Sequence, residues 1–435
     1  MYAYAPQEIQ DLRARQAWTL ERLSPAFRTR NQVLGTKRTI GCVALEVTQR
    51  CNLDCSICYL SPNSETTPDI PLETILHRAR NIRDQYGVGT NVQVTGGDPT
   101  LRNHDELVTV VRYLRDLKLV PSLFTNGIKC TRELLTRLKE VGLVDVAFHV
   151  DLTEKRQGYS SEAQLCAVRE EYIERARGLG LNVIFNQTVF ARNFSEVPVL
   201  AEFYKRNADV VGMASFQLQA DTGRGLTRKR KDVISLDTVS AHIETALGIG
   251  LSWENVLFGH PKCHRIGYAL VFGEGEHVAD LFDDRQQVEE MLWMSRDTYF
   301  DRTRPRRAVM QGFEAAAKAG WLGPGLKYWG RRARENWRPI LKSKGRIRKL
   351  SFFMQNFQDG RALDHERVDN CSFHTMNDAG GVSMCVHNAY RDHYLSGGTG
   401  YPAAYQQIRE QDGYPRLTPG MIAPEPAQSP TQQPV

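Results

Sequence analysis

The sequence has no apolar run that approaches the length of a membrane span, and its N-terminus lacks the charged start and apolar stretch of a signal peptide. We therefore expect a cytoplasmic protein, with a peripheral position at the inner face of the membrane as an alternative. Its 435 residues, 41% of them hydrophobic, can bury a sizeable core, and the length favours two or three domains. The oligomeric state is left open.

Cysteine is sparse except in one loop, which holds Cys51, Cys55 and Cys58. Thiolates spaced three and then two residues apart can converge on a soft metal centre, and cysteine is the usual ligand of iron–sulfur clusters. Three thiolates leave a four-iron cluster one ligand short, so that a small molecule can bind the open iron and exchange electrons with it. The spacing predicts a reactive site; a zinc site or three unrelated buried thiols is the alternative.

This C-x3-C-x2-C loop resembles the signature of the radical S-adenosylmethionine (SAM) superfamily, although the aromatic residue that many members carry before the third cysteine is Ile57 here. The resemblance implies a 4Fe–4S cluster that binds S-adenosyl-L-methionine and cleaves it to a 5′-deoxyadenosyl radical. It also implies a one-electron reductant, such as flavodoxin or ferredoxin, as a partner. Since such clusters need a reducing compartment, the nine cysteines are not expected to form disulfides.

Strand and helix patterns alternate after the first apolar run. Strands are predicted at 42–47, 92–95, 122–125, 144–150, 183–189 and 211–218, with helices at 72–86 and about 104–117, 131–141, 162–179 and 195–207. Six strands joined by five helical crossovers predict a parallel sheet. We therefore expect an α/β fold, a partial (β/α)6 barrel, followed by a mostly helical, cysteine-containing C-terminal extension.

Ligands of parallel sheets bind at the carboxyl ends of the strands, so the residues that follow each run are the candidates. Gly96, Gly97 and Asp98 follow the second strand. Paired glycines allow close backbone approach and suit a loop whose carbonyls bind an amino group. The run resembles the family's GGEP motif, with aspartate in place of glutamate, which implies a contact with the amino group of SAM.

Later strand ends offer polar side chains that the resemblance assigns to the carboxylate, ribose and adenine of SAM: Asn126, Asp151, Asn186 and Gln219. Each of them singly also fits an ordinary turn or strand-end residue. No catalytic residue stands out beyond this set.

Three more cysteines lie beyond the barrel in loops that also carry histidines: Cys263, Cys371 and Cys385. The first precedes an apolar strand at 266–272. Soft ligands with imidazoles beside them predict a second metal centre, an auxiliary iron–sulfur cluster. A mononuclear iron or zinc site and plain structural thiols remain as alternatives.

The segment 353–371, with 381–388 beyond it, is similar to the C-terminal region of the archaeal tetraether lipid synthases and their folate-dependent methyltransferase-like relatives. The archaeal pattern has adjacent cysteines where this chain has Asn370 and Cys371, and the extra N-terminal cluster motif of those proteins is absent. The similarity spans roughly residues 259–395 and indicates a subfamily rather than a substrate.

A basic stretch from Arg302 to Lys349 has 15 Lys or Arg against two Glu, a net charge of +13 that leaves −7 for the rest of the chain. Trp, Tyr and Phe are interleaved with the basic residues. Cations mixed with amphipathic rings suit an anionic membrane surface. RNA phosphates would attract the same charges, and a solvated helical face is the third interpretation.

These patterns predict six segments along the chain. They are a helical lead-in (1–40), the radical SAM partial barrel (41–225), a linker with the start of a C-terminal domain (226–300), a basic aromatic helical segment (301–350), a cysteine-containing auxiliary-metal region (351–412) and a disordered tail (413–435).

The sequence thus predicts a radical SAM enzyme that abstracts hydrogen from an apolar, lipid-like substrate for C–C bond formation or methylation. An RNA-modifying radical SAM enzyme is the first alternative. An iron–sulfur sensor that binds nucleic acid is the second, against which the Gly96–Asp98 turn argues, because a sensor has no need of a cradle for an amino group.

Overall fold

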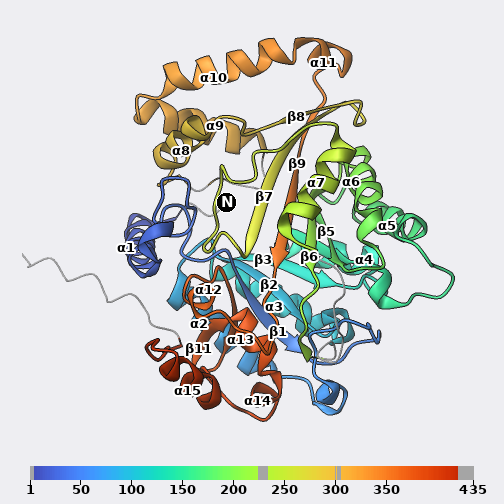
Figure 1. Cartoon of the computed structure of the whole chain (residues 1–435), viewed down its shortest axis with the longest axis vertical. Coiled ribbons are helices and arrows are strands. Elements are labelled where there is room, and N and C mark those ends of the chain that lie inside the picture. The colour runs from blue at the N-terminus through green and yellow to red at the C-terminus, as the bar shows by residue number, and fades with distance from the viewer. Residues whose placement is uncertain (1–3, 224–233, 299, 301–304, 420–435) are drawn as a thin grey trace, which may run out of the picture.

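The computed structural model describes residues 4–223, 234–298, 300 and 305–419. Its strands form one curled sheet in the order β11-β10-β1-β2-β3-β4-β5-β6-β9-β7-β8 (Figure 1). The strands are β1 (Cys42–Thr48), β2 (Asn91–Gly96), β3 (Val120–Thr125), β4 (Asp145–His149), β5 (Asn182–Val189), β6 (Val211–Leu218), β7 (His264–Phe272), β8 (His277–Asp280), β9 (Ile347–Asn356), β10 (Phe373–Asn377) and β11 (Gly380–Ser383).

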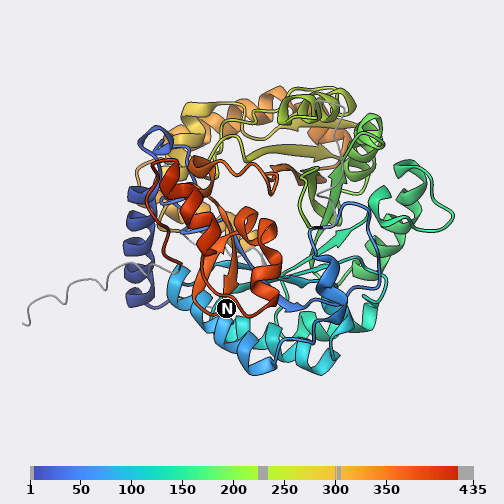
Figure 2. The same cartoon turned by 60° about the horizontal axis from the view of Figure 1, so that its bottom comes forward.

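Helices surround this sheet. They are α1 (Pro6–Arg22), α2 (Leu72–Tyr86), α3 (His104–Asp116), α4 (Arg132–Glu140), α5 (Glu162–Ala176), α6 (Val197–Arg206), α7 (Leu236–Leu247), α8 (Arg285–Met294), α9 (Pro305–Lys318), α10 (Leu322–Glu335), α11 (Trp337–Lys342), α12 (His365–Asp369), α13 (Met384–Ala389), α14 (Arg391–Leu395) and α15 (Ala403–Gln411). In Figure 2 the blue to green helices ring the outside of the sheet, and the red C-terminal helices lie across its interior.

The six strands from β1 to β6 are parallel throughout, and a helix follows each of the first five. This confirms the predicted α/β fold with a parallel sheet core. The helices pack by their apolar stripes: α2, for example, buries Ile75, Ala79 and Ile82 in the main core. Capping side chains fix several helix starts, such as Asn103 for α3 and Thr131 for α4.

Side-chain alternation along the strands separates core from cavity. In β2, Val92 and Val94 are fully buried in the core, whereas Gln93 and Thr95 face the interior of the barrel. Successive residues of a strand point to opposite faces, so an apolar–polar alternation places polar groups inside the barrel. The interior is therefore equipped to hold a polar ligand.

The C-terminal region holds helices, as predicted, and also adds strands to both sides of the barrel. On one side β9 pairs in parallel with β6, and β7 runs antiparallel beside it. On the other side β10 pairs in parallel with β1 and turns back into β11. Strands from before and after the predicted boundary at residue 225 therefore belong to one sheet, while the six segment limits stay predictions.

The predicted basic segment contains α9, α10 and α11, which lie at the top of Figure 1, at the end opposite to α13, α14 and α15. Residues 301–304 of that segment, and residues 420–435 of the predicted tail, lie outside the described residues. Within the described ranges, no helix combines the length and apolar character needed to span a membrane.

Candidate active site

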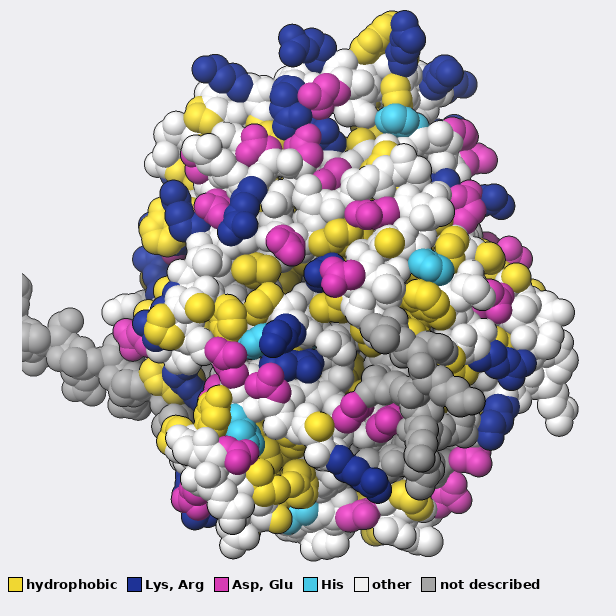
Figure 3. Space-filling model, in the orientation of Figure 1, with side chains coloured by type: hydrophobic (Ala, Val, Ile, Leu, Met, Phe, Trp, Pro, Cys, Tyr) yellow, Lys and Arg dark blue, Asp and Glu magenta, His cyan; other side chains and the backbone are white. Residues whose placement is uncertain are grey.

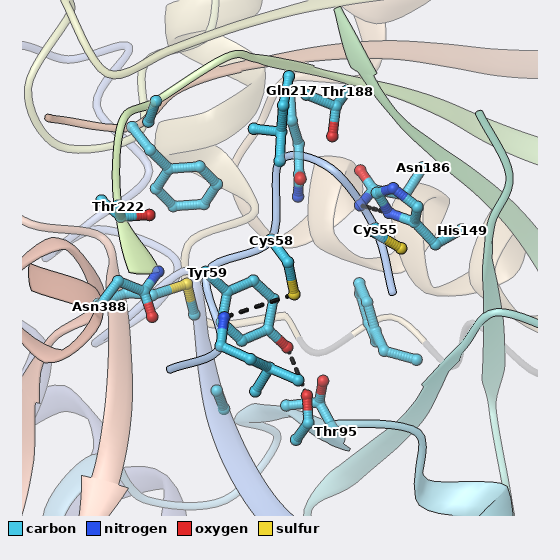
Figure 4. Close-up of a pocket in the computed structure, with 18 of the residues that line it drawn as sticks. Cys55, Cys58, Tyr59, Thr95, His149, Asn186, Thr188, Gln217, Thr222 and Asn388 are labelled. Carbon is cyan, nitrogen blue, oxygen red and sulfur yellow. Dashed lines mark hydrogen bonds between the residues drawn. The ribbon is translucent and has the colours of Figure 1, made fainter. Parts of the chain in front are cut away.

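A cavity of about 210 Å³ lies at the carboxyl ends of the barrel strands. Its walls include inward-facing barrel residues, such as Asn186 and Gln217, and a residue of the C-terminal region, Asn388 (Figure 4). Gln355, also from the C-terminal region, lines the cavity as well. Ligands of parallel α/β sheets bind at this end. Both parts of the chain therefore contribute to one site.

The three loop cysteines, Cys51, Cys55 and Cys58, all line this cavity. The loop that carries them is fastened by its backbone: the Asp98 amide donates to the Arg50 carbonyl at 2.8 Å, and the Ser56 amide donates to the Thr153 carbonyl at 2.9 Å. The thiols therefore lie on a loop held between the ends of β2 and β4.

The glycine pair fits against the start of this loop. Gly96 has φ of +130°, and a Cβ added there would lie 2.0 Å from the Thr48 carbonyl oxygen. A Cβ on Gly97 would lie equally close, 2.0 Å, to the Arg50 carbonyl oxygen. Such approaches exclude any side chain, so both positions require glycine for the loop to reach its place. Tyr59 follows the third cysteine, and its hydroxyl donates to the Gly96 carbonyl at 2.6 Å.

The Asp98 carboxylate is turned into the protein. It is almost fully buried and accepts hydrogen bonds from the amides of Thr100 (2.9 Å) and Asn126 (2.8 Å) and from the hydroxyl of Thr125 (2.8 Å). These bonds tie the end of β2 to the end of β3. The side chain thus organises the turn, and any contact of this turn with a ligand falls to its backbone.

Asn126 lies between the same turn and the cysteine loop. Its side-chain amide donates to Asn52 Oδ1 at 2.7 Å and lies 3.9 Å from the Cys51 sulfur, while its own Oδ1 accepts from the Ile128 amide. The predicted candidate therefore lines the cavity and braces a loop cysteine.

Asp151 is fully buried and supports its neighbours. It accepts hydrogen bonds from His149 Nε2 (2.8 Å) and from the amides of Thr153 (2.7 Å) and Thr188 (2.6 Å). Burial alone would raise the pKa of Asp151, but His149 and the hydrogen bonds from Thr153 and Thr188 together outweigh burial and lower the pKa to about 2. Burial opposes the charge on His149 in turn, but the Asp151 carboxylate raises the net pKa of the imidazole.

Asn186 extends this series of hydrogen bonds into the cavity. Its side-chain nitrogen is 3.1 Å from His149 Nδ1, which accepts from it when Nε2 donates to Asp151. The Asn186 Oδ1 atom is buried without a partner among the described residues. A buried acceptor of this kind is costly unless a ligand supplies a donor.

The last predicted candidate, Gln219, donates to Asp221 Oδ1 at 3.1 Å. The cavity wall at this strand end is formed by Gln217, Leu218 and Thr222. Gln217, two positions earlier, thus lines the cavity. The role predicted for Gln219 stays a prediction.

Glu154 is a buried carboxyl in the cavity wall that sequence patterns did not single out. Burial raises its pKa to about 7, even though Arg156 Nε donates to it at 2.6 Å. Arg156 also binds the Asn126 carbonyl and the Tyr172 hydroxyl. The one sequence signal was its place in the turn after a strand end.

Arg391 of α14 closes the cavity from the C-terminal side. Its guanidinium donates to Glu46 Oε1 (2.8 Å), Gln49 Oε1 (3.3 Å) and Asn388 Oδ1 (2.9 Å), and it lies 4.6 Å from the centroid of the Tyr59 ring. Burial would raise the pKa of Glu46, but Arg391, His387 and Gln49 together outweigh burial and lower the pKa to about 2. A buried ion pair thus joins β1 to the C-terminal helices.

The three cysteines of the extension have different surroundings. Cys385 lines the cavity, Cys263 accepts from Arg367 Nε at 3.3 Å, and the Cys371 thiol donates to the Phe373 carbonyl at 2.9 Å. Burial raises the pKa of Cys385 to about 12, and the other two thiols lie near enough to contribute. The predicted auxiliary cluster stays a prediction.

No group of three or more His, Cys, Asp or Glu side chains in the described ranges is placed to hold a single metal ion. This includes the loop cysteines. A four-iron cluster differs from a single ion because its thiolates bind separate irons and stand farther apart.

Comparison with known proteins matches residues 45–203 to the model of the radical SAM superfamily. The chain is 30% identical over 186 residues to 7,8-dihydro-6-hydroxymethylpterin dimethyltransferase of Methanocaldococcus jannaschii, which covers 41% of this chain and 36% of the relative. It is 26% identical over 216 residues to the PqqA peptide cyclase of Bradyrhizobium diazoefficiens, covering 47% and 54%. The chain therefore spans about a third to a half of the length of these relatives.

Among solved structures, the chain is similar to Streptococcus suis SuiB bound to S-adenosylmethionine, with a TM-score of 0.37, 16% identity and coverage of 47% of this chain and 46% of the other. It is also similar to anSMEcpe with bound AdoMet, with a TM-score of 0.38, 14% identity and coverage of 47% and 59%.

Proposed function

We propose that this chain is a radical SAM enzyme, since residues 45–203 match the model of that superfamily, and that it cleaves SAM reductively and abstracts hydrogen from a small molecule held in the cavity. The observation that carries the proposal is the presence of Cys51, Cys55 and Cys58 in one cavity with the Gly96–Gly97 turn. A 4Fe–4S cluster on these thiolates would supply the electron that cleaves SAM to methionine and a 5′-deoxyadenosyl radical.

The residues present fit both groups. Three thiols on one fastened loop suit a cluster with an open iron. Gly96 and Gly97 line the cavity without side chains, so their backbone suits the amino group of SAM. The unpartnered Asn186 Oδ1 suits a donor on the adenosyl part. We assign these contacts to the cofactor as part of the proposal.

The C-terminal helices form one wall of the site and cover it on that side. Arg391 and Glu46 satisfy each other inside the protein, and Tyr59 packs under the guanidinium next to the third loop cysteine. A water-excluded site prevents reactive intermediates from being lost in side reactions. This closure supports chemistry on a radical.

The cavity wall supports a flat, hydrogen-bonding heterocycle as substrate. Gln93, Gln217 and Gln355 project from three strands, and Phe124 and Phe357 lie in the same wall. An amide offers a donor and an acceptor side by side, and aromatic rings present faces on which a flat molecule can pack. The pterin in the name of the archaeal relative is a molecule of this class.

A lipid-like substrate, and C–C bond formation or methylation as the outcome, stay predictions from the sequence, with RNA modification as the alternative. Apolar wall residues such as Leu53 and Ile57 would suit an alkyl group. Gln217 already donates to Gln355 Oε1 at 3.4 Å, but an alkyl chain would leave the remaining polar groups of these amides without a partner, which disfavours a wholly apolar substrate.

The first experiment tests cleavage of SAM. The anaerobically reconstituted wild type should release 5′-deoxyadenosine under dithionite, and reduced flavodoxin or ferredoxin should replace dithionite. The variant with Ala at Cys51, Cys55 and Cys58 should release none, whereas Cys166→Ala, a change on α5 away from the cavity, should match the wild type. Release by the triple variant would contradict the proposal.

The second experiment tests the substrate class. Reduced pterins, purine nucleotides, RNA and a lipid extract are supplied in deuterated form with SAM, and transfer of deuterium into 5′-deoxyadenosine is measured. Transfer is expected from a heterocycle. Transfer from the lipid extract alone would restore the lipid prediction, and transfer from RNA alone would support the alternative.

A further inference from the structure

Three consecutive helices at one end of the molecule leave large apolar side chains exposed. On α9, Val309, Met310 and Phe313 are more than half exposed. On α11, Trp337 is 53% and Leu341 68% exposed. Exposed apolar side chains gathered in this way, on neighbouring helices, mark an interaction surface rather than scattered surface residues.

On α10 these side chains form a stripe. Leu322, Leu326 and Trp329 are spaced i, i+4 and i+7, so they lie on one face of the helix, and Leu326 is 65% exposed. The opposite side of α10 is fixed to the body: the Tyr328 hydroxyl donates to the Leu281 carbonyl at 2.6 Å, and Arg332 donates to Asp283 at 2.9 Å. The stripe is therefore held facing outward.

Basic side chains border the apolar ones. Lys327, Arg334, Arg338 and Lys342 are exposed and form no ion pair within the described ranges. Figure 3 shows Lys and Arg side chains projecting around the top of the molecule, over α10 and α11, with hydrophobic side chains among them. Arg331 and Arg332, in contrast, are engaged with Asp283 and Glu335 and belong to the attachment of α10.

We propose that the outer face of α9–α11 docks on an anionic membrane surface. An apolar stripe bordered by cations is the pattern of an interfacial helix, whose apolar side enters the headgroup boundary while Lys and Arg meet lipid phosphates. Trp329 and Trp337 suit the headgroup level. Docking in this way requires no membrane-spanning helix.

The aliphatic residues favour a membrane over RNA. Cations and aromatic rings would serve either partner, since bases stack on rings and phosphates attract cations. Val309, Leu322, Leu326 and Leu341 would find no counterpart on an RNA backbone, because aliphatic side chains neither stack on bases nor bind phosphate. A bilayer buries all of them.

The docking test uses the reconstituted full-length protein and vesicles of phosphatidylcholine with or without phosphatidylglycerol. We expect sedimentation with the anionic vesicles only, a blue shift of tryptophan fluorescence, and release as salt rises. Replacing Lys327, Arg334, Arg338 and Lys342 by Gln should weaken binding by roughly two to three orders of magnitude.

A second variant tests the apolar face. Serine at Leu322, Leu326 and Leu341 should abolish the fluorescence shift, because all three side chains are exposed and their loss leaves the core intact. The matched control carries serine at Val199 and Ile408, exposed apolar residues on other helices, and should bind like the wild type. Equal circular dichroism and iron content establish that each variant is folded.

Three outcomes would overturn the proposal. One is wild-type protein that stays in solution with anionic vesicles at low salt. Another is tight, saturable binding to structured RNA without vesicle binding. The third is a dimer that the triple-serine variant dissociates, since the stripe would then be an interface between two copies of this chain.

Discussion

Gly97 lies so close to the cysteine loop that one added carbon would displace the loop. Gly97→Ala would place a Cβ 2.0 Å from the Arg50 carbonyl oxygen, a backbone atom that cannot move without its neighbours. We expect the variant to bind less cluster iron and to lose about 1–3 kcal/mol of stability, as overpacking generally costs. Iron analysis and urea unfolding measure the two effects.

Gly330→Ala is the control for that substitution. A Cβ at Gly330 meets nothing within 4 Å, and the residue lies inside α10. Alanine there should raise stability by about 0.5–1 kcal/mol and leave the iron content unchanged. Equal effects of the two substitutions would show that contact with the loop is unimportant.

Asp98→Asn tests the buried carboxylate. The carboxylate accepts from two amides and from the Thr125 hydroxyl, and an amide group would turn a donor toward one of these donors. The free energy of unfolding should fall by about 1–3 kcal/mol, the cost of an unmatched buried polar group. Asp116→Asn, on the exposed end of α3, should change it by less than about 0.5 kcal/mol. Urea unfolding of the two variants and the wild type measures both changes in free energy.

Among the secondary-structure elements, those of the barrel and the later strand at 266–272, which is β7, could be predicted, but the pairing of the later strands with the barrel could not. Each of β1–β6 is a short β-branched or aromatic run, so local pattern locates it within a residue or two. The pairing of β10 with β1 and of β9 with β6 joins segments far apart in the chain, and residue periodicity carries no information about which strands become neighbours.

The residues of the candidate site also divide into those that local sequence patterns predict and those that they do not. The loop cysteines and the glycine turn were predicted because their spacing is local, and they lie in one cavity. Arg391 was missed because its partner, Glu46, is 345 residues away. Glu154 was missed because nothing in the sequence around it signals burial.

Glu46→Gln tests the link between β1 and α14. The folded-state pKa of Glu46 is about 2 against an ordinary 4.5, a shift that corresponds to about 3 kcal/mol of stability. Because the pKa is lowered on folding, this stability is fully present above pH 4.5 and is lost as the pH falls toward 2. The variant should therefore be about 3 kcal/mol less stable than wild type at pH 7, and the difference should shrink below pH 4.5.

Urea unfolding of both proteins at several pH values checks this expectation. Glu140→Gln, an exposed change at the end of α4, should leave the pH profile unchanged. A constant difference between wild type and Glu46→Gln at all pH values would argue against the charge as the source.

For the molecule as a whole, the C-terminal region completes the sheet. β10 covers the edge of β1 that β2 leaves open, and β11 continues from it. Removing residues 357–435 should therefore expose an apolar strand edge next to the cysteine loop and drive aggregation. We expect the truncated chain in the insoluble fraction, and supply of the missing segment as a separate chain should return part of it to solution. A monodisperse truncated chain would show that β1 needs no second neighbour.

The pairing of β10 with β1 also has a consequence for biosynthesis. Cys58 is synthesised 325 residues before Ser383, the last residue of β11. At about 5–20 residues per second, the ribosome needs about 16–65 s to add those residues. Throughout that interval the loop thiols lack the wall that later encloses them, so iron delivered then would meet an open, oxidisable site. We expect cluster loading to follow chain release, and pulse-labelled nascent chains should carry no iron until they reach full length.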